Sequence, residues 1–137
     1  EIPLGTWEIL KKGDGVLIVA CGSMVSPSLA AANELENSGI RCTVVNGRFI
    51  KPMDTGLLAT EARKASSIVT VEENSLVGGF GSGVIEILAE MGIEKPVLRL
   101  GIPDIFLPHG GQKTCRKGLG LDKSGIARSI AQWIKKE

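Results

Sequence analysis

The sequence predicts a three-layer α/β/α domain on a five-stranded, mostly parallel sheet with one antiparallel edge strand. Short apolar, β-branched segments alternate along the chain with segments whose apolar residues recur at helical spacing. Such alternation is typical of parallel strands joined by right-handed crossovers. The first two expected strands are joined by a short Asp-Gly turn at residues 11–15. This turn is too short for a crossover, so we expect that pair to be antiparallel.

Five segments have the composition of strands. Residues 16–21 and 68–71 are continuous apolar runs, as in strands that are buried on both faces. Residues 6–11 alternate in the manner of an edge strand. The remaining strands are expected at 41–46 and 97–100. Together they predict one domain over residues 1–137, with Glu1 to Gly5 as the remnant of a linker.

Four helices are expected between and after these strands, each with a start or stop signal. Ser26 and Pro27 begin the first, which ends at Gly39; Asp54 caps the second; the third runs from Val84 to Gly92; and Ser124 caps the last. One further helical turn is expected at residues 112–117.

The stretch at 66–91 organises the expected site. Its apolar strand ends in charge, a glycine-rich turn follows at 78–83, and then the third helix begins. In an open α/β sheet, ligands and partners gather at the carboxyl ends of the strands. The candidates for an interface or an anion-binding site are therefore Glu72, Glu73, Gly79, Phe80, Gly81 and Ser82, together with His109 from a later loop.

Each candidate also has a purely structural interpretation. Gly79 and Gly81 suit a turn that needs positive φ or close packing, although the free amides at a helix start can also bind an anion. Glu72 and Glu73 would face opposite sides of an extended strand, so they need not act as a pair. His109, the only histidine, can serve as an acid or base, anchor its loop, or hydrogen-bond a neighbouring subunit.

Motifs of catalysis and nucleotide binding are incomplete. Gly13-Asp14-Gly15 could open a thiamine-diphosphate signature, but no Asn-Asn follows and a strand comes next, so we interpret it as a turn. A dinucleotide fingerprint from Gly79 would need glycine where Val84 stands. The chain has no Walker Gly-Lys-Ser/Thr, and Ser82 lacks the glycine spacing of a nucleophile elbow.

Two basic side chains in the loop after the third expected strand are further candidates. Arg48 and Lys51 could bind phosphate or carboxylate, and salt bridges to Asp54, Glu72 or Glu73 are an equal alternative.

Composition narrows the class of protein. A net charge of +1 without a concentrated basic run argues against nucleic acid or an anionic membrane as partner. The longest apolar run is too short to span a bilayer. Cys21, Cys42 and Cys115 are odd in number and widely spaced, which favours a reducing, cytoplasmic compartment.

Five stretches together resemble a known family. They are CGSMVSPSLAAANEL, VVNGRFIKPMD, TVEENSLVGGFGSGV, GIPDIFLPHG and GLGLDKSGIA. Across nearly the whole chain they are similar to the carboxyl-terminal domain of the 1-deoxy-D-xylulose-5-phosphate synthases, in the transketolase group. The first three are shared more loosely with transketolases and with the β subunits of 2-oxo-acid dehydrogenases.

This resemblance implies a transferase that condenses pyruvate with glyceraldehyde 3-phosphate on the route to isoprenoids. It implies thiamine diphosphate and Mg²⁺ in the full enzyme, with their ligands on the domains that precede this one and none in this domain. The expected partners are those thiamine-binding domains, in a homodimer. The role implied for this domain is that of a scaffold and a dimer interface, with the acidic strand end and the glycine turn facing the rest of the enzyme.

Two other functions stay open. The chain could be a natural subunit that completes a split transketolase or 2-oxo-acid dehydrogenase-type enzyme, or an anion-binding regulatory module. The start at Glu1, in a linker-like stretch, favours an excised domain that is inactive alone. We also expect Leu76 and Phe80 to form an exposed apolar patch of the kind that marks an interface.

Overall fold

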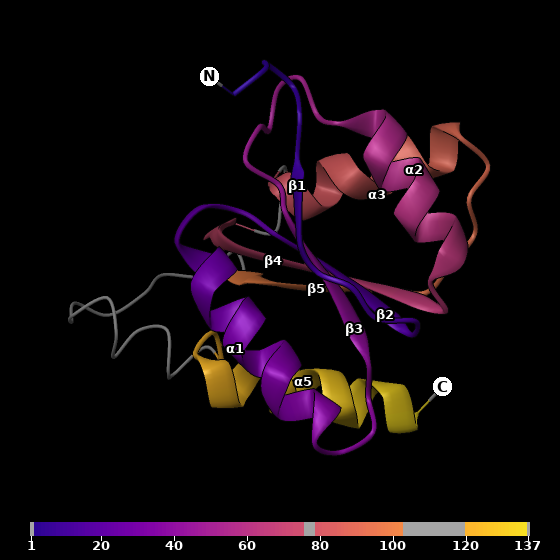
Figure 1. Ribbon diagram of the computed structural model, residues 1–137. Coiled ribbons are helices and arrows are strands. Elements are labelled where there is room, and N and C mark those ends of the chain that lie inside the picture. The colour runs from indigo at the N-terminus through magenta and orange to yellow at the C-terminus, as the bar shows by residue number, and fades with distance from the viewer. Residues whose placement is uncertain (1, 76–78, 103–119, 137) are drawn as a thin grey trace.

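The computed structural model describes residues 2–75, 79–102 and 120–136. Its centre is one five-stranded sheet in the order β1-β3-β2-β4-β5 (Figure 1). The strands are β1 (Glu8–Lys11), β2 (Val16–Ala20), β3 (Cys42–Asn46), β4 (Ser67–Ser75) and β5 (Val97–Ile102). β2 through β5 run parallel and β1 is antiparallel. The predicted fold class is therefore confirmed.

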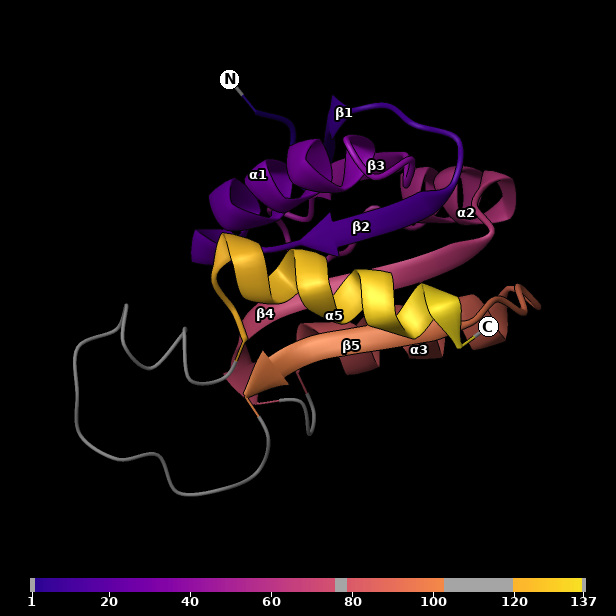
Figure 2. The same ribbon diagram turned by 90° about the horizontal axis from the view of Figure 1, so that it is seen from below.

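Helices cover both faces of this sheet. They are α1 (Val25–Glu36), α2 (Thr55–Lys64), α3 (Phe80–Glu90) and α5 (Lys123–Lys135), with a short 3₁₀ turn, η1 (Gly22–Met24), ahead of α1. Figures 1 and 2 show α1 and α5 on one face and α2 and α3 on the other. Each face has its own apolar core, because alternate residues of every strand point to opposite sides. None of the helices in the described part of the chain is long and apolar enough to cross a bilayer.

The edge strand β1 pairs with β3 and not with β2, so the predicted hairpin is wrong. Glu8 lies opposite Asn46 in this antiparallel pair. The reason is that β2 already has a parallel partner on each side, β3 and β4. The turn between β1 and β2 is also fastened to β3, since the Gly13 amide donates to Thr43 Oγ1 at 3.0 Å and that hydroxyl donates to the Gly13 carbonyl at 2.8 Å.

The stretch predicted as a strand end and a flexible turn is folded differently. β4 continues through the acidic residues to Ser75, and α3 already begins at Phe80. Gly81 and Gly83 are therefore helical residues, and the described glycines with positive φ do not include Gly79 or Gly81. Of the two reasons that the sequence offers for these glycines, positive φ is therefore excluded at both positions, and close packing remains.

Two of the three predicted helix caps need correction. Asp54 caps α2 as expected, accepting from the Leu57 amide at 3.1 Å. Ser26 lies inside the first turn of α1, because η1 leads into that helix directly. Asp122, not Ser124, caps α5 by accepting from the Gly125 amide at 2.8 Å. The helical turn expected at 112–117 lies outside the described residues.

Candidate functional site at the carboxyl edge of the sheet

The parallel strands end together at one edge of the sheet. Cys21 and Ser23 follow β2, Arg48 follows β3, and the acidic residues lie in the last part of β4, where α3 begins. Because β1 is antiparallel, the segment ahead of it also reaches this edge. The topology thus brings together residues from distant parts of the sequence, as expected for the functional edge of an α/β sheet.

Glu72 has a structural role at the start of α3. Its side chain is fully buried, and its two carboxylate oxygens accept from the amides of Phe80 at 2.7 Å and Gly81 at 2.5 Å. These amides belong to the first turn of α3, which lacks a side-chain cap of its own at Gly79. A carboxylate on the strand therefore caps the helix and supplies the negative charge that a helix N-terminus favours. An anion at this helix start would compete with Glu72 for the same amides.

Phe80 is buried, so the predicted exposure of its side chain is wrong. Only 2% of its surface is accessible. Its ring contacts that of Trp7, with centroids 5.8 Å apart and planes tilted by 50°. It also presses against Gly47, where an added Cβ would lie 2.6 Å from the phenyl Cζ. Leu76, the other half of the expected patch, lies outside the described residues.

Glu73 points to the opposite face of the sheet from Glu72. It accepts a hydrogen bond from the Ser23 hydroxyl on η1. It also lines an open pocket of about 380 Å³ together with Cys21, Arg48 and Ile50. The alternation of the strand thus separates the two acidic side chains, and they do not form a carboxylate pair.

Arg48 is held by the segment that precedes β1. Its guanidinium donates to the Thr6 carbonyl at 2.7 Å and to Thr6 Oγ1 at 3.1 Å, and it lies 3.8 Å from the Glu8 carboxylate. The salt-bridge partners considered from the sequence did not include Glu8. Asp54 instead accepts from the backbone amides of Trp7 and Leu57.

The remaining candidates lie around the start of α3. Ser82 accepts a hydrogen bond from Arg99 Nη1 at 3.1 Å. Gly79 and Ser82 line a second open pocket, of about 370 Å³, which also includes Ile50. His109 lies outside the described residues.

Metal-binding and nucleophilic groups are scarce among the described residues of this edge. Within the described ranges no group of three His, Cys, Asp or Glu side chains could hold a metal ion. Burial, aided by the nearby charge of Glu72, raises the pKa of the Cys21 thiol to about 11, so the thiolate that a nucleophile needs is scarce at neutral pH. The described part of this edge therefore contains open pockets and hydrogen-bonding groups, and its described residues include neither a metal-binding group nor a reactive thiol.

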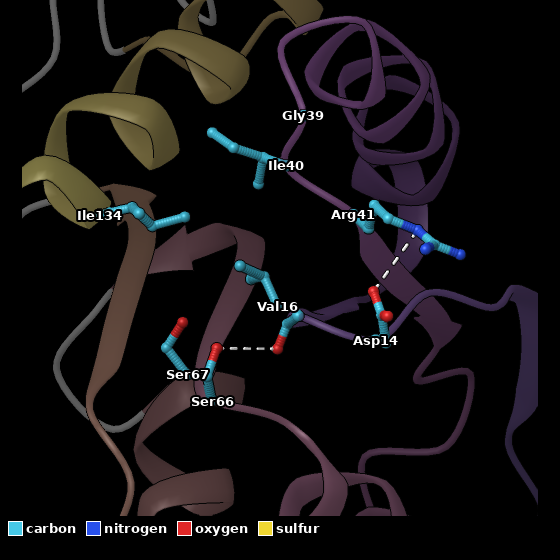
Figure 3. A pocket seen from close by; sticks show the side chains of 9 residues that line it. Asp14, Val16, Gly39, Ile40, Arg41, Ser66, Ser67 and Ile134 are labelled. Atoms are coloured by element: carbon cyan, nitrogen blue, oxygen red, sulfur yellow. Dashed lines mark hydrogen bonds and ion pairs between the residues drawn. The ribbon is translucent and has the colours of Figure 1, made fainter.

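A different pocket, of about 350 Å³, opens at the amino edge of the sheet (Figure 3). Aliphatic side chains of Ile40 and Ile134 point into it. Ser66 already donates to the Gly15 carbonyl at 3.1 Å, and on the rim Arg41 and Asp14 form an exposed ion pair at 3.4 Å. Ser66, Arg41 and Asp14 are thus already paired within the pocket and its rim. Ligands of α/β sheets usually bind at the opposite edge, where the carboxyl ends of the strands lie.

Comparisons with known proteins agree with this fold. Residues 5–126 match the family described as "Transketolase, C-terminal domain". A relative from Geobacter sulfurreducens named 1-deoxy-D-xylulose-5-phosphate synthase 1 is 52% identical over 98% of this chain. Relatives named 1-deoxy-D-xylulose-5-phosphate synthase from Gloeobacter violaceus and Aquifex aeolicus are 50% and 45% identical over 99% and 98% of it. The chain spans about a fifth of the length of these curated relatives.

Solved structures support the same relationship. A structure titled as a split gene transketolase, an inactive β4 tetramer, has a TM-score of 0.88 at 35% identity, over 96% of this chain and 43% of that one. A transketolase from Campylobacter jejuni has a TM-score of 0.70 at 19% identity, over 93% of this chain and 18% of that one, and shows the shared fold. With the strand order, the antiparallel edge strand and the matched residues in agreement, the chain belongs to the transketolase C-terminal domain family.

Proposed function

We propose that this chain is the carboxyl-terminal domain of a thiamine-diphosphate-dependent 1-deoxy-D-xylulose-5-phosphate synthase. The observation that carries the proposal is the identity of about half of the residues, over nearly the whole chain, with three relatives that bear this name. The reaction of the whole enzyme is the condensation of pyruvate with glyceraldehyde 3-phosphate. The domain itself has a structural and interface role and is inactive alone.

The cofactor belongs to the rest of the enzyme in this proposal. Thiamine diphosphate and Mg²⁺ bind to the thiamine-binding domains that precede this one, and the complete enzyme is a cytoplasmic homodimer. One observation supports this division: Glu72, a fully buried carboxylate in the described part of the carboxyl edge, is used to cap α3. Neither nucleic acid nor membrane is a partner in this proposal.

The proposal predicts that the isolated chain neither binds thiamine diphosphate in the presence of Mg²⁺ nor releases carbon dioxide from pyruvate. Titration calorimetry and a carbon dioxide release assay measure the two outcomes. The full-length Geobacter sulfurreducens relative is the positive control in both. Micromolar cofactor binding to this chain alone would contradict the proposed division of roles.

A second candidate is a natural subunit that completes a split transketolase-type enzyme. The likeness to the split gene transketolase structure favours it, because that similarity covers almost all of this chain. The coding sequence around residue 1 separates the two candidates. An open reading frame that continues upstream into thiamine-binding domains supports the first, and a separate gene for those domains supports the second.

A further inference from the structure

The carboxyl edge of the sheet exposes apolar side chains other than the two that the sequence predicts there. Ile2, Leu4 and Ile50 have 57%, 76% and 44% of their surface accessible. They are three of the five large hydrophobic residues that are exposed in the described part of the chain. The other two, Leu10 on β1 and Met91 after α3, are 36% and 37% accessible. We call Ile2, Leu4 and Ile50 the edge patch.

The two segments that carry the edge patch are fastened to each other. The segment before β1 and the loop after β3 run side by side in Figure 1, and two hydrogen bonds join them: Arg48 Nε to the Thr6 carbonyl at 2.7 Å and Trp7 Nε1 to the Phe49 carbonyl at 2.8 Å. An added Cβ at Gly5 would lie 3.0 Å from Pro52 Cγ, which shows how closely the Gly5 backbone packs against the Pro52 ring. The edge patch therefore rests on a fixed support.

Two open pockets border Ile50. Ile50 lines both the pocket that includes Arg48 and Glu73, of about 380 Å³, and the pocket that includes Gly79 and Ser82, of about 370 Å³. Arg48 and Glu73 thus lie beside the exposed Ile50, an arrangement typical of an interface, which has an apolar centre and a polar rim.

We infer that the edge patch is the surface on which this domain docks against the remainder of the enzyme polypeptide. This inference rests on the proposed function, because the chain spans about a fifth of its curated relatives and the other four fifths supply the occupant. An apolar surface rimmed by polar groups is typical of a site that a partner covers. Glu72 and Phe80, which the sequence suggested for this interface, face inward and only shape the edge beneath it.

Footprinting by photochemical carbene labelling and mass spectrometry tests this inference. The two samples are the isolated chain and a chimera in which this chain replaces the matching stretch of the full-length Geobacter sulfurreducens relative. Labelling of Ile2, Leu4 and Ile50 is expected to fall about fivefold in the chimera, as for residues at the centre of an interface. Met91, equally apolar but at the opposite end of α3, is the matched control and is expected to label equally in both.

The substitution Ile50→Asp in the chimera is expected to restore labelling at Ile2 and Leu4, whereas Met91→Asp leaves it unchanged. Equal labelling of the edge patch in both samples would overturn the inference, even for a chimera that is fully active. Protection in an inactive chimera would instead support the docking surface and count against the proposed activity. A host that fails to fold with the exchanged stretch is replaced by the Gloeobacter violaceus or Aquifex aeolicus relative.

Sedimentation of the isolated chain tests the other possible occupant, a second copy. The chain is expected to be monomeric at micromolar concentration. A dimer that the Ile50→Asp variant abolishes and the Met91→Asp variant keeps would show that the edge patch joins two copies, and the docking inference would be wrong.

Discussion

At the scale of single residues, Glu72 and Gly81 both depend on the close approach of α3 to β4. The Glu72 carboxylate reaches the first amides of α3 only because the helix start lies close against β4. That approach leaves no room for a side chain at Gly81, where an added Cβ would lie 2.6 Å from Thr70 Oγ1 and 2.9 Å from Glu72 Oε2. Close packing, and not positive φ, therefore requires this glycine.

The substitution Gly81→Ala is expected to destabilise the chain. Alanine gains up to about 1 kcal/mol of helix propensity, but overpacking a buried site costs about 1–3 kcal/mol. Neither neighbour can move cheaply, because Thr70 is fully buried and Glu72 is fixed by two hydrogen bonds. The free energy of unfolding, measured by urea denaturation, should therefore fall.

Gly56→Ala is the matched control for that prediction. Gly56 is exposed in the first turn of α2, and the nearest atom to an added Cβ is Asp54 Oδ1 at 3.9 Å. Alanine there should stabilise the chain by up to about 1 kcal/mol. Gain of stability at both positions would mean that the close approach of α3 to β4 is not a constraint. At Gly79, where φ is −83°, alanine carries no positive-φ penalty.

At the scale of elements, the helix starts show how neighbouring polar residues compete to act as the cap. Asp122 has extended backbone, and its side chain accepts from the Gly125 amide. Ser124 also has a good capping side chain, but it lies within the first turn of α5. The difference is two residues, which is the usual uncertainty of a helix boundary read from sequence.

The substitutions Asp122→Ala and Ser124→Ala should separate the two assignments. Loss of the Asp122 cap is expected to cost about 1 kcal/mol, since one helix amide loses its acceptor. Ser124→Ala should change stability by less than about 0.5 kcal/mol, as for an exposed position in a helix. Thermal unfolding of both variants measures the difference, and a larger loss for Ser124→Ala would assign the cap to the serine.

At the scale of the whole molecule, the sheet buries two thiols, one near each of the two apolar cores. Cys42 and Cys21 have 0% and 6% of their surface accessible, and both are free thiols. Burial raises the pKa of each thiol from 9.0 to about 11. The charge of Glu72 adds to the rise at Cys21, whereas Lys11 works against it at Cys42.

The stability of the chain should therefore fall in alkaline solution. A thiol with a raised pKa stabilises the folded state fully below pH 9.0, where the unfolded thiol is still protonated. Above pH 9.0 the unfolded state releases the proton first, so this stability is lost as the pH rises through about 11.

The melting temperature, followed from neutral pH to about 11, measures this loss, and the double variant Cys21→Ala, Cys42→Ala is the control. Its melting temperature should fall less steeply above pH 9.0. Equal slopes would show that the two thiols do not contribute.

The local features of this protein follow from its amino-acid sequence. Apolar runs placed the strands, the periodic segments placed the helices, and the short turn before β2 excluded a parallel first strand. Each of these depends on neighbouring residues in the chain. The quoted stretches also carried the family resemblance, which the matched residues 5–126 confirm.

The contacts between residues that are distant in the chain follow only from the folded arrangement. In this arrangement β1 pairs with β3, and Glu72 caps α3. Phe80 is buried against Trp7, and hydrogen bonds join the two segments that carry the edge patch. Such choices depend on which strand edge and which apolar surface are still free when the sheet assembles. The residue types show that Phe80 is apolar and that Glu72 is charged, but only the packing of α3 on β4 decides that both are buried.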